Sequence, residues 1–354
     1  MRTLVIGGTG FIGRFLVPRL VESGHEVAVV MRPESEARLP EGARAVRADR
    51  RRLPESAREL RALAPDVVID LILSSGRQAD DLMSVFRGHA GRLVAISSVD
   101  VYRATEVLHR LVDGPLEPVP LTEESALRTM LQTYPAAQIA MLKQLFGWLD
   151  DEYDKIPAER SVSGHADLPS TILRLPMIHG PGDRLHRFHG LIKRMQDGRR
   201  TIVLAESVAR WRGPRGYVEN VAEACLLAAA SPRAVGRTYN VSEAESLTEL
   251  EWARLIAHAM RWEGEFVVVP DDDAPESVRM PGDLRQHWAA DSTRIRTELG
   301  YTEPVPRDEA VRRTVAWERA NPPAAPMSAF DYDAEDAAAL RASSRRSAPG
   351  STQR

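Results

Sequence analysis

The sequence contains a single cysteine, Cys225, and only three lysines among its 47 basic residues, namely Lys143, Lys155 and Lys193. One cysteine excludes an intramolecular disulfide and a metal site built from several thiolates. Cys225 lies in an apolar helical run, where core packing is the expected role. We predict no metal site. Because lysine is scarce, each lysine is a candidate for a specific role.

Long apolar runs and a large net charge are also missing. No apolar run reaches the length that crosses a membrane, and the N-terminus leads directly into a strand pattern instead of a signal peptide. The net charge of −3 argues against a nucleic-acid-binding surface. We therefore expect a cytoplasmic protein that acts on a small-molecule substrate, without a membrane or nucleic-acid partner.

Glycines spaced three apart are the most informative feature that is present. An apolar strand pattern over 3–6 leads into Gly7, Gly10 and Gly13, and an apolar helical pattern follows. Such a turn lets the backbone approach a pyrophosphate, which then faces the N–H groups of the helix N-terminus. The pattern predicts a dinucleotide-binding loop, and the residues assigned to the cofactor are Gly7, Thr9, Gly10, Phe11, Ile12 and Gly13.

Short apolar strands alternate with helical stretches through the first half of the chain. This alternation predicts an α/β fold with a parallel sheet covered on both faces. The expected strands are 3–6, 26–31, 45–47, 66–73, 92–97 and 170–175. Further along, helical patterns cover 123–149, 191–197, 218–230 and 248–259, and a strand pattern covers 265–269.

Several motifs occur in the order of a known family. They are the glycine loop, the segments 97–102, 155–159, 171–182 and 217–222, and then 239–241, 291–294 and 298–301. The chain thereby resembles the extended short-chain dehydrogenase/reductase family, the NAD-dependent epimerase/dehydratase group, over about residues 1–320. The resemblance implies a Rossmann doubly wound parallel sheet with a smaller C-terminal substrate lobe.

The implied domain boundaries follow from this resemblance. Residues 1–176, joined by about 216–247, would form the NAD(P)-binding Rossmann domain. Residues 177–215 and 248–321 would form the substrate lobe. We expect the tail 322–354 to be mostly disordered, because it has little apolar patterning. The resemblance also implies a possible homodimer, because family members commonly dimerise.

The end of the second strand bears on the choice of cofactor. In the family, an acidic residue there binds the ribose 2′-OH of NAD, whereas this chain has Met31 followed by Arg32. An arginine without a neighbouring carboxylate suits a 2′-phosphate, so we expect NADP(H) in preference to NAD(H). Asp49 matches the position that contacts adenine, although it could equally cap a turn. Met177 and Lys155 are further positions assigned to the cofactor.

The family's chemistry uses a Ser or Thr, a Tyr and a Lys, in which the tyrosine exchanges a proton with the substrate oxygen. Ser98 and Lys155 match two of these positions. The tyrosine should precede the lysine by four residues, but position 151 is Asp. We favour Tyr153 as its replacement, provided that the helix begins near Asp154, and we keep Tyr134 as the alternative.

Other polar residues are candidates for the same site. Asp100 matches an acidic base of the family's sugar dehydratases, or it caps a turn. His179 replaces the tyrosine of a Tyr-Gly-Pro loop, and either donates a proton or packs. Five arginines lie in the segment that contacts nucleotide diphosphates in sugar-modifying relatives, and we select Arg212 and Arg215 for that role. The whole set is Arg187, Arg194, Arg210, Arg212 and Arg215.

These features predict an NAD(P)-dependent oxidoreductase of the epimerase/dehydratase type, acting on a nucleotide-sugar or another polyhydroxylated or carbonyl substrate. Two alternatives remain. One is an NADPH-dependent carbonyl reductase of a biosynthetic pathway. The other is a catalytically degraded dinucleotide-binding regulator similar to RNA-associated relatives, which the missing tyrosine favours and the net charge of −3 opposes.

Overall fold

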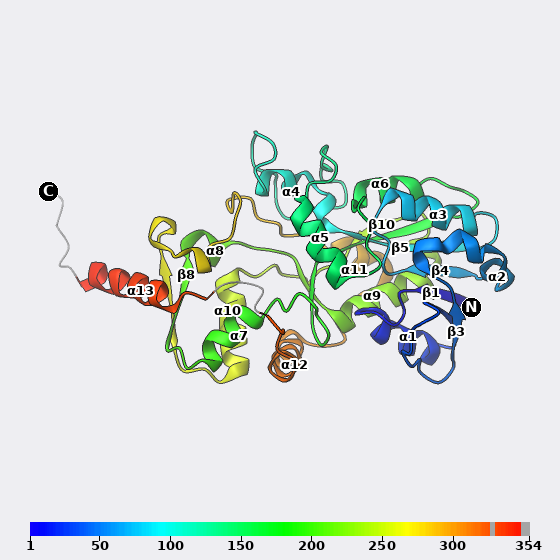
Figure 1. The fold of residues 1–354 in the computed structure, drawn as a ribbon. Helices are drawn as coiled ribbons and strands as arrows, with labels where there is room; N and C mark the ends of the chain where they lie inside the picture. The colour runs from blue at the N-terminus through cyan, green and yellow to red at the C-terminus, as the bar shows by residue number, and fades with distance from the viewer. Residues whose placement is uncertain (326–329, 348–354) are drawn as a thin grey trace.

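A parallel sheet of seven strands forms the centre of the structure, a computed structural model that describes residues 1–325 and 330–347 (Figure 1). Every neighbouring pair of these strands is parallel. The chain moves outward from β1 to β3, returns to β4 and continues to the opposite edge, which confirms the predicted doubly wound fold. The order across the sheet is β10 (Thr238–Asn240), β6 (Ser170–Leu175), β5 (Arg92–Ser98), β4 (Val67–Asp70), β1 (Arg2–Ile6), β2 (Glu26–Met31) and β3 (Ala43–Arg47).

Helices cover both faces of the sheet because alternate strand residues are apolar on both sides. Val5 and Val29 pack on one face, and Leu4 and Ala28 on the other. The first face is covered by α1 (Gly13–Glu22), α9 (Val218–Ala230) and α11 (Thr293–Leu299). The second is covered by α2 (Ala57–Ala62), α3 (Gly76–Phe86) and α6 (Lys155–Val162).

The six strands predicted for the first half all exist, and β2 and β6 have the predicted bounds. The predicted strand 66–73 ends earlier, at Asp70, and the residues that follow it turn away from the sheet. Asp70 accepts hydrogen bonds from the backbone N–H of Ile72 and from the buried guanidinium of Arg50. This arrangement ends the strand at the edge where parallel sheets bind ligands.

A second group of elements has its own apolar core. Its centre is Trp252, which packs with Phe188, Ile192 and Val315. The helices of this group are α7 (His189–Gln196), α8 (Glu206–Arg210), α10 (Glu249–Met260) and α12 (Arg307–Ala320). Two parallel strand pairs complete it, β8 (Thr201–Ala205) with β11 (Glu265–Val269) and β7 (Met177–His179) with β9 (Arg215–Tyr217). The division into two domains at the expected boundaries remains a prediction.

The segment 123–149 differs from the continuous helix that its pattern predicts. Only α5 (Ala136–Leu145) is an α-helix there, while α4 (Arg103–Leu108) lies before the segment. Residues 123–134 form an irregular loop instead, because the guanidinium of Arg128 is buried against Asp154 at 2.7 Å. Pro135 then occupies the N-cap of α5, where the missing N–H costs nothing.

The C-terminal tail is more ordered than expected. Helix α13 (Tyr332–Ser347) packs on β8 and β11, and Figure 1 shows it beside β8. Ala338 is buried against Val203 and Val269. Arg194 and Glu335 form a buried ion pair of 2.6 Å that holds the helix in place. The expectation of a mostly disordered tail is therefore wrong over this helix, and residues 326–329 and 348–354 lie outside the described part.

Short 3-10 turns connect several of these elements. They cover Arg50–Ser56, Val99–Val101, Pro232–Ala234, Asp271–Asp273 and Glu276–Val278. Within the described residues 1–325 and 330–347, none of the helices combines the length and the apolar character needed to cross a bilayer.

Candidate active site

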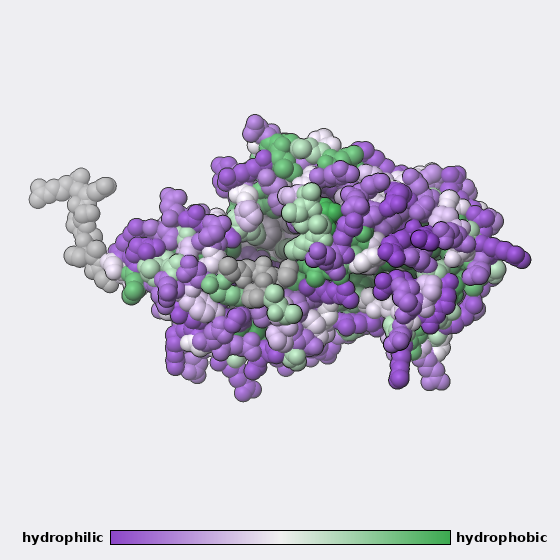
Figure 2. All heavy atoms as spheres, in the orientation of Figure 1, coloured by the Kyte–Doolittle hydropathy of each residue, from purple (hydrophilic) through white to green (hydrophobic). Residues whose placement is uncertain are grey.

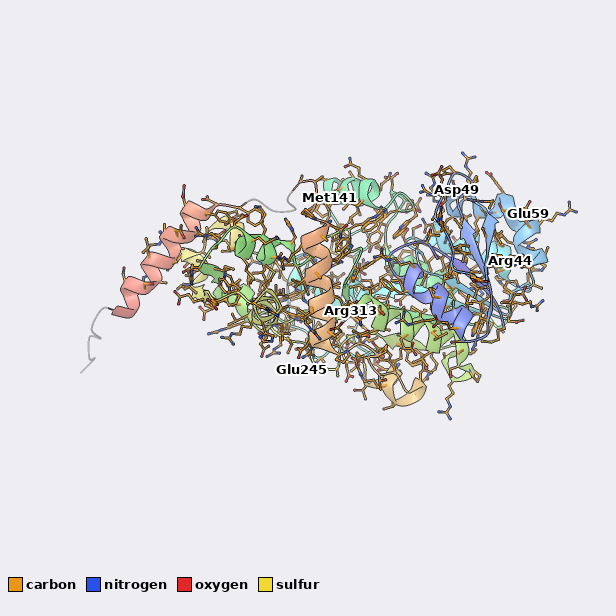
Figure 3. The ribbon with its side chains drawn as sticks, turned by 90° about the horizontal axis from the view of Figure 1, so that it is seen from below. Arg44, Asp49, Glu59, Met141, Glu245 and Arg313 are labelled. Carbon is orange, nitrogen blue, oxygen red and sulfur yellow. The ribbon has the colours of Figure 1, made fainter. Side chains whose placement is uncertain are left out.

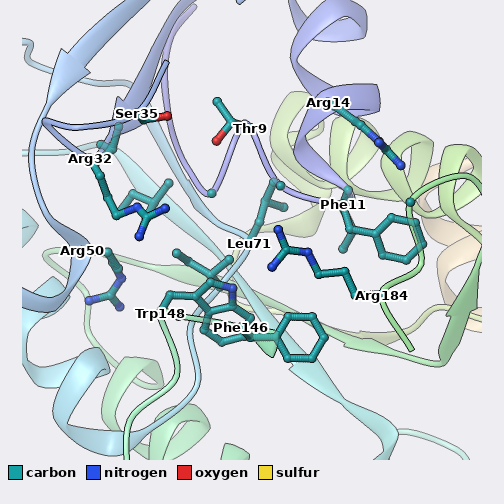
Figure 4. A pocket seen from close by; sticks show the side chains of 18 of the residues that line it. Thr9, Phe11, Arg14, Arg32, Ser35, Arg50, Leu71, Phe146, Trp148 and Arg184 are labelled. Carbon is teal, nitrogen blue, oxygen red and sulfur yellow. The ribbon is translucent and has the colours of Figure 1, made fainter. Parts of the chain in front are cut away.

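A cavity of about 450 Å³ opens at the carboxyl ends of β1, β2 and β4 (Figure 4). The glycine loop forms one wall, and the close-up shows Phe146 and Trp148 on the side opposite Thr9. Most residues that we assigned to a cofactor line it, including Gly7, Thr9, Gly10, Phe11, Ile12, Arg32 and Asp49.

The glycine loop fits a pyrophosphate because its backbone is too closely packed for side chains. Gly7 has a φ of +83°, which side chains other than glycine rarely adopt. A Cβ at Gly13 would lie 2.4 Å from the carbonyl oxygen of Gly7, so only glycine lets the helix start so close to the loop. Gly13 thus shapes the cavity from behind without lining it.

Two arginines of this cavity have no carboxylate partner among the residues that the structure describes. Arg14 follows the glycine loop, and burial lowers the pKa of its guanidinium below the ordinary value. Arg184 extends into the cavity between Phe146 and Leu71 in Figure 4 and donates a hydrogen bond to the carbonyl oxygen of Leu145 at 2.5 Å. Both side chains face the cavity without a carboxylate partner in the described part of the chain, so both guanidinium groups suit an anionic ligand.

The predicted cofactor residues outside the glycine loop have mixed surroundings. Arg32 is largely exposed at the cavity rim, 3.6 Å from Glu34. Asp49 lines the cavity. Its carboxylate also accepts a hydrogen bond from the backbone N–H of Arg51, which confirms that Asp49 caps the turn. Burial opposes ionisation of Asp49, but the hydrogen bonds from Arg51 hold its pKa below the ordinary value.

Met177, like Lys155, is a cofactor assignment that does not line this cavity. Its side chain packs against Trp211 and Leu108, whereas its neighbours Pro176 and Ile178 line the cavity. Because successive residues of an extended chain face opposite sides, a position shifted by one residue would have been the better assignment.

Lys155 is the first residue of α6, and Asp154 is its N-cap. The Lys155 ammonium is buried and donates hydrogen bonds to the carbonyl oxygens of Leu73 and Ile96. Burial lowers the pKa of Lys155 to about 8, against the opposing effects of Asp100 and other carboxylates. Because α6 begins at Lys155, Tyr153 lies in the loop before the helix, as its proposed role requires. Its ring centre is 6.0 Å from the lysine nitrogen.

Asp100 and two tyrosines form a cluster beside this lysine. The Tyr134 hydroxyl donates to Asp100 at 3.0 Å, and the ring centres of Tyr134 and Tyr153 lie 5.6 Å apart. Burial raises the pKa of Asp100 above the ordinary value, although Arg128 and Lys155 oppose this. Burial and the nearby Asp100 also hold the pKa of both tyrosines well above 10. Within the described part of the chain, the second carboxylate oxygen of Asp100 receives no hydrogen bond.

The geometry brings together both tyrosines that the sequence left open. Tyr134 comes from the irregular loop before α5, and Arg128 fixes that loop by donating to the carbonyl oxygen of Asp100 at 2.9 Å. The sequence offered no signal for Arg128, because one buried arginine cannot be distinguished from many exposed ones. Ser98 accepts the N–H of Asp100 at 3.2 Å, which positions the acid at the end of β5.

The arginines and the histidine that we assigned to the substrate have structural partners. Arg215 is buried against Glu249 at 2.6 Å, and Arg212 lies 3.6 Å from Glu251. His179 is fully buried among Phe188, Tyr217 and Trp252, and its Nδ1 lies 3.0 Å from the Thr314 hydroxyl oxygen. For His179 the packing interpretation therefore holds, and burial lowers the pKa of its imidazole.

A doubly wound sheet with a glycine-rich first turn and a cavity at its carboxyl edge defines a dinucleotide-binding protein of the Rossmann class. The model of the NAD-dependent epimerase/dehydratase family matches residues 3–242, and the chain belongs to this family.

Comparison with individual proteins agrees with this assignment. The chain is 38% identical over 128 residues to 2′-dehydrokanamycin reductase of Streptomyces kanamyceticus, which covers 36% of this chain and 32% of that protein. It is 28% identical over 207 residues to 3-diazoavenalumate denitrifying reductase of a Streptomyces species, covering 56% of this chain and 63% of the relative. The chain thus matches less than two thirds of the length of these curated relatives.

Among solved structures, dTDP-glucose 4,6-dehydratase of Bacillus anthracis in complex with NAD superposes with a TM-score of 0.63 at 15% identity, covering 91% of this chain and 97% of that one. This likeness concerns the fold. Both curated relatives are named reductases, so the alternative of a degraded RNA-associated regulator is not favoured.

Proposed function

We propose that this protein is an NADP(H)-dependent oxidoreductase that interconverts a carbonyl group and the corresponding secondary alcohol. The observation that carries the proposal is the cluster of Asp100, Tyr134, Tyr153 and Lys155. The segment 146–148, which precedes Tyr153 in the chain, lines the dinucleotide cavity. Family membership and the names of the two curated reductases support the proposal.

The preference for NADP(H) is supported by charge at the adenosine end of the cavity. Met31 ends β2 without a carboxylate, and Arg32 and Arg51 line the same wall. Arg51 is paired with Asp49 at 3.0 Å, whereas Arg32 lies 3.6 Å from the exposed Glu34, a looser contact that a phosphate could replace. A 2′-phosphate would therefore find the Arg32 guanidinium as a donor and Met31, not a carboxylate, as the last residue of the strand.

The residues of the cluster can move one proton while hydride is exchanged. A bound nicotinamide supplies or accepts the hydride. In reduction, the Tyr153 hydroxyl donates its proton to the substrate oxygen, and the buried carboxyl group of Asp100, which is hydrogen-bonded to Tyr134, is the group placed to return that proton. The Lys155 ammonium stabilises the developing negative charge, and Ser98 holds Asp100 in place.

The test compares two single substitutions in NADPH-dependent reduction. Tyr153→Phe should lower kcat about 100-fold or more, because the proton donor is lost. Tyr134→Phe should lower it less, by about tenfold, because it removes only the hydrogen bond to Asp100. The reverse order would assign the proton transfer to Tyr134, and full activity in both variants would refute the proposed role of the cluster.

A direct measurement addresses the cofactor. Purified protein is denatured and any released dinucleotide is identified, and stripped protein is titrated with NADPH and with NADH. Saturable binding of NADPH is the expected result. Binding of neither dinucleotide would overturn the proposed function.

A further inference from the structure

The five arginines of the substrate segment are all neutralised by carboxylates. This is unfavourable for a nucleotide diphosphate, because its phosphates would have to displace ion pairs, two of which are buried. The pairs are Arg187 with Asp183 at 2.7 Å, Arg194 with Glu335 at 2.6 Å, Arg210 with Glu206 at 2.7 Å, Arg212 with Glu251 at 3.6 Å and Arg215 with Glu249 at 2.6 Å.

The dinucleotide cavity differs in part. Its lining includes Arg14 and Arg184, which have no carboxylate partner in the described part of the chain, whereas its other arginines, Arg32, Arg50, Arg51 and Arg187, each have one. Within the described residues, the dinucleotide cavity thus keeps two unpaired guanidinium groups, whereas each of the five arginines of the substrate segment has a carboxylate partner. This contrast indicates a substrate without phosphate.

A second cavity, of about 570 Å³, lies next to the catalytic cluster. Tyr134 and Tyr153 form one wall, and Lys143, the basic side chain of the lining, is paired with Asp151 at 2.5 Å. Its size is that of a small-molecule site. The remaining lining comes from Gln132, Ala136, Ile139, Ala140 and Gln144.

Helix α5 provides the apolar part of this cavity and has no buried residue of its own. Ile139 and Ala140 face the cavity, and Met141, labelled in Figure 3, is exposed. Figure 2 shows hydrophobic side chains gathered over α5. The segment then continues into Phe146 and Trp148, which line the dinucleotide cavity, so α5 borders both cavities.

We propose that the substrate is a compact, phosphate-free cyclic ketone, or its alcohol, bound between α5 and the Tyr134–Tyr153 pair. This inference rests on the proposed function. Aromatic rings and small aliphatic side chains suit the face of a ring, and the carboxamides of Gln132 and Gln144 suit its hydroxyl groups. The carbonyl oxygen points to the tyrosine hydroxyls, where the proton is exchanged.

The first experiment titrates the NADPH-loaded protein with UDP and with UDP-glucose by calorimetry. No binding is expected at concentrations up to about 1 mM, because the arginines are already paired. Binding of either nucleotide below that concentration would overturn the inference. The NADPH titration made beforehand separates this result from failure of the proposed function.

The second experiment follows NADPH oxidation with cyclohexanone and hydroxylated cyclohexanones as probes. Ala140→Trp fills the cavity and should raise KM about tenfold or more without changing the Kd of NADPH. Gln138→Trp on the same helix lies outside the cavity lining and should leave KM unchanged.

Two outcomes would refute the site. One is reduction of none of the ring ketones by protein that binds NADPH, and the other is an equal effect of the two tryptophan variants. The first would exclude this substrate class, and the second would show that the α5 cavity is not where the substrate binds.

Discussion

At the scale of single residues, the site depends on buried charge. Lys155 and Asp100 are both buried. Burial lowers the pKa of Lys155 and raises the pKa of Asp100, because it disfavours the charged form of each group. Groups with such shifted pKa values are suited to proton transfer near neutral pH. The resemblance to the family pointed to both residues, but the pKa shifts arise from surroundings that several distant segments build.

Lys155 gives a stability prediction with a defined sign. Its pKa is about 8 when folded and 10.5 in the reference state, so the unfolded chain binds more protons between these values. The cost of burying the charge is therefore present below pH 8 and is relieved as pH rises from about 8 to 10.5. Wild-type protein should gain stability relative to Lys155→Met over this range, by a few kcal/mol at most.

Urea denaturation of both proteins at pH 7, 8, 9 and 10 checks this prediction. Lys143→Met is the matched control, because Lys143 is partly exposed and pairs with the exposed Asp151. A constant difference between wild type and Lys155→Met across the range would contradict the assigned pKa.

At the scale of elements, the polar C-terminal tail contains a helix, α13, that packs on the rest of the protein although its composition predicts disorder. The tail beyond residue 321 has few apolar residues, yet α13 needs only small ones, because Ala338 fits flat against β8 and β11. The buried pair of Arg194 and Glu335 compensates for the charge that makes the segment look solvated. The continuous helix predicted over 123–149 was wrong for a related reason, since a distant partner of Arg128 decided the local structure.

Helix α13 should stabilise the group of elements on which it packs. Ala338→Asp places a carboxylate among Val203, Val267 and Val269, and should destabilise this part of the protein by about 2 kcal/mol or more. Limited proteolysis and thermal unfolding measure the effect.

Leu340→Asp on the same helix is the control, because Leu340 is 68% exposed and the added charge stays in water. Equal loss of stability in the two variants would show that the packing of α13 is not as described.

At the scale of the whole molecule, the dinucleotide cavity joins distant parts of the chain. The glycine loop, the end of β2, the residues after α5 and the loop containing Arg184 all contribute to it. A ligand that contacts all of them should stabilise the folded state as a unit, by about 2.7 kcal/mol at a hundred times its Kd.

NADPH should therefore raise the melting temperature more than NADH at the same concentration. Arg32→Ala should remove most of this difference, with roughly tenfold weaker NADPH binding and unchanged NADH binding. Arg44→Ala is the control, because Arg44 lies on β3 away from the cavity lining and pairs with Glu26 at 3.8 Å (Figure 3). A larger shift with NADH would reverse the assigned preference.

Local patterns were enough to predict the family, the strands of the sheet and the dinucleotide loop. Glycine spacing and apolar alternation reflect backbone sterics and burial, which are properties of neighbouring residues. The pairing of the substrate-segment arginines, the placement of Tyr134 on Asp100 and the docking of α13 could not be predicted in this way. The pairs of Arg194, Arg212 and Arg215, the contact of Tyr134 with Asp100 and the docking of α13 depend on partners from another part of the chain, and the strength of such contacts is set by burial that only the assembled fold creates.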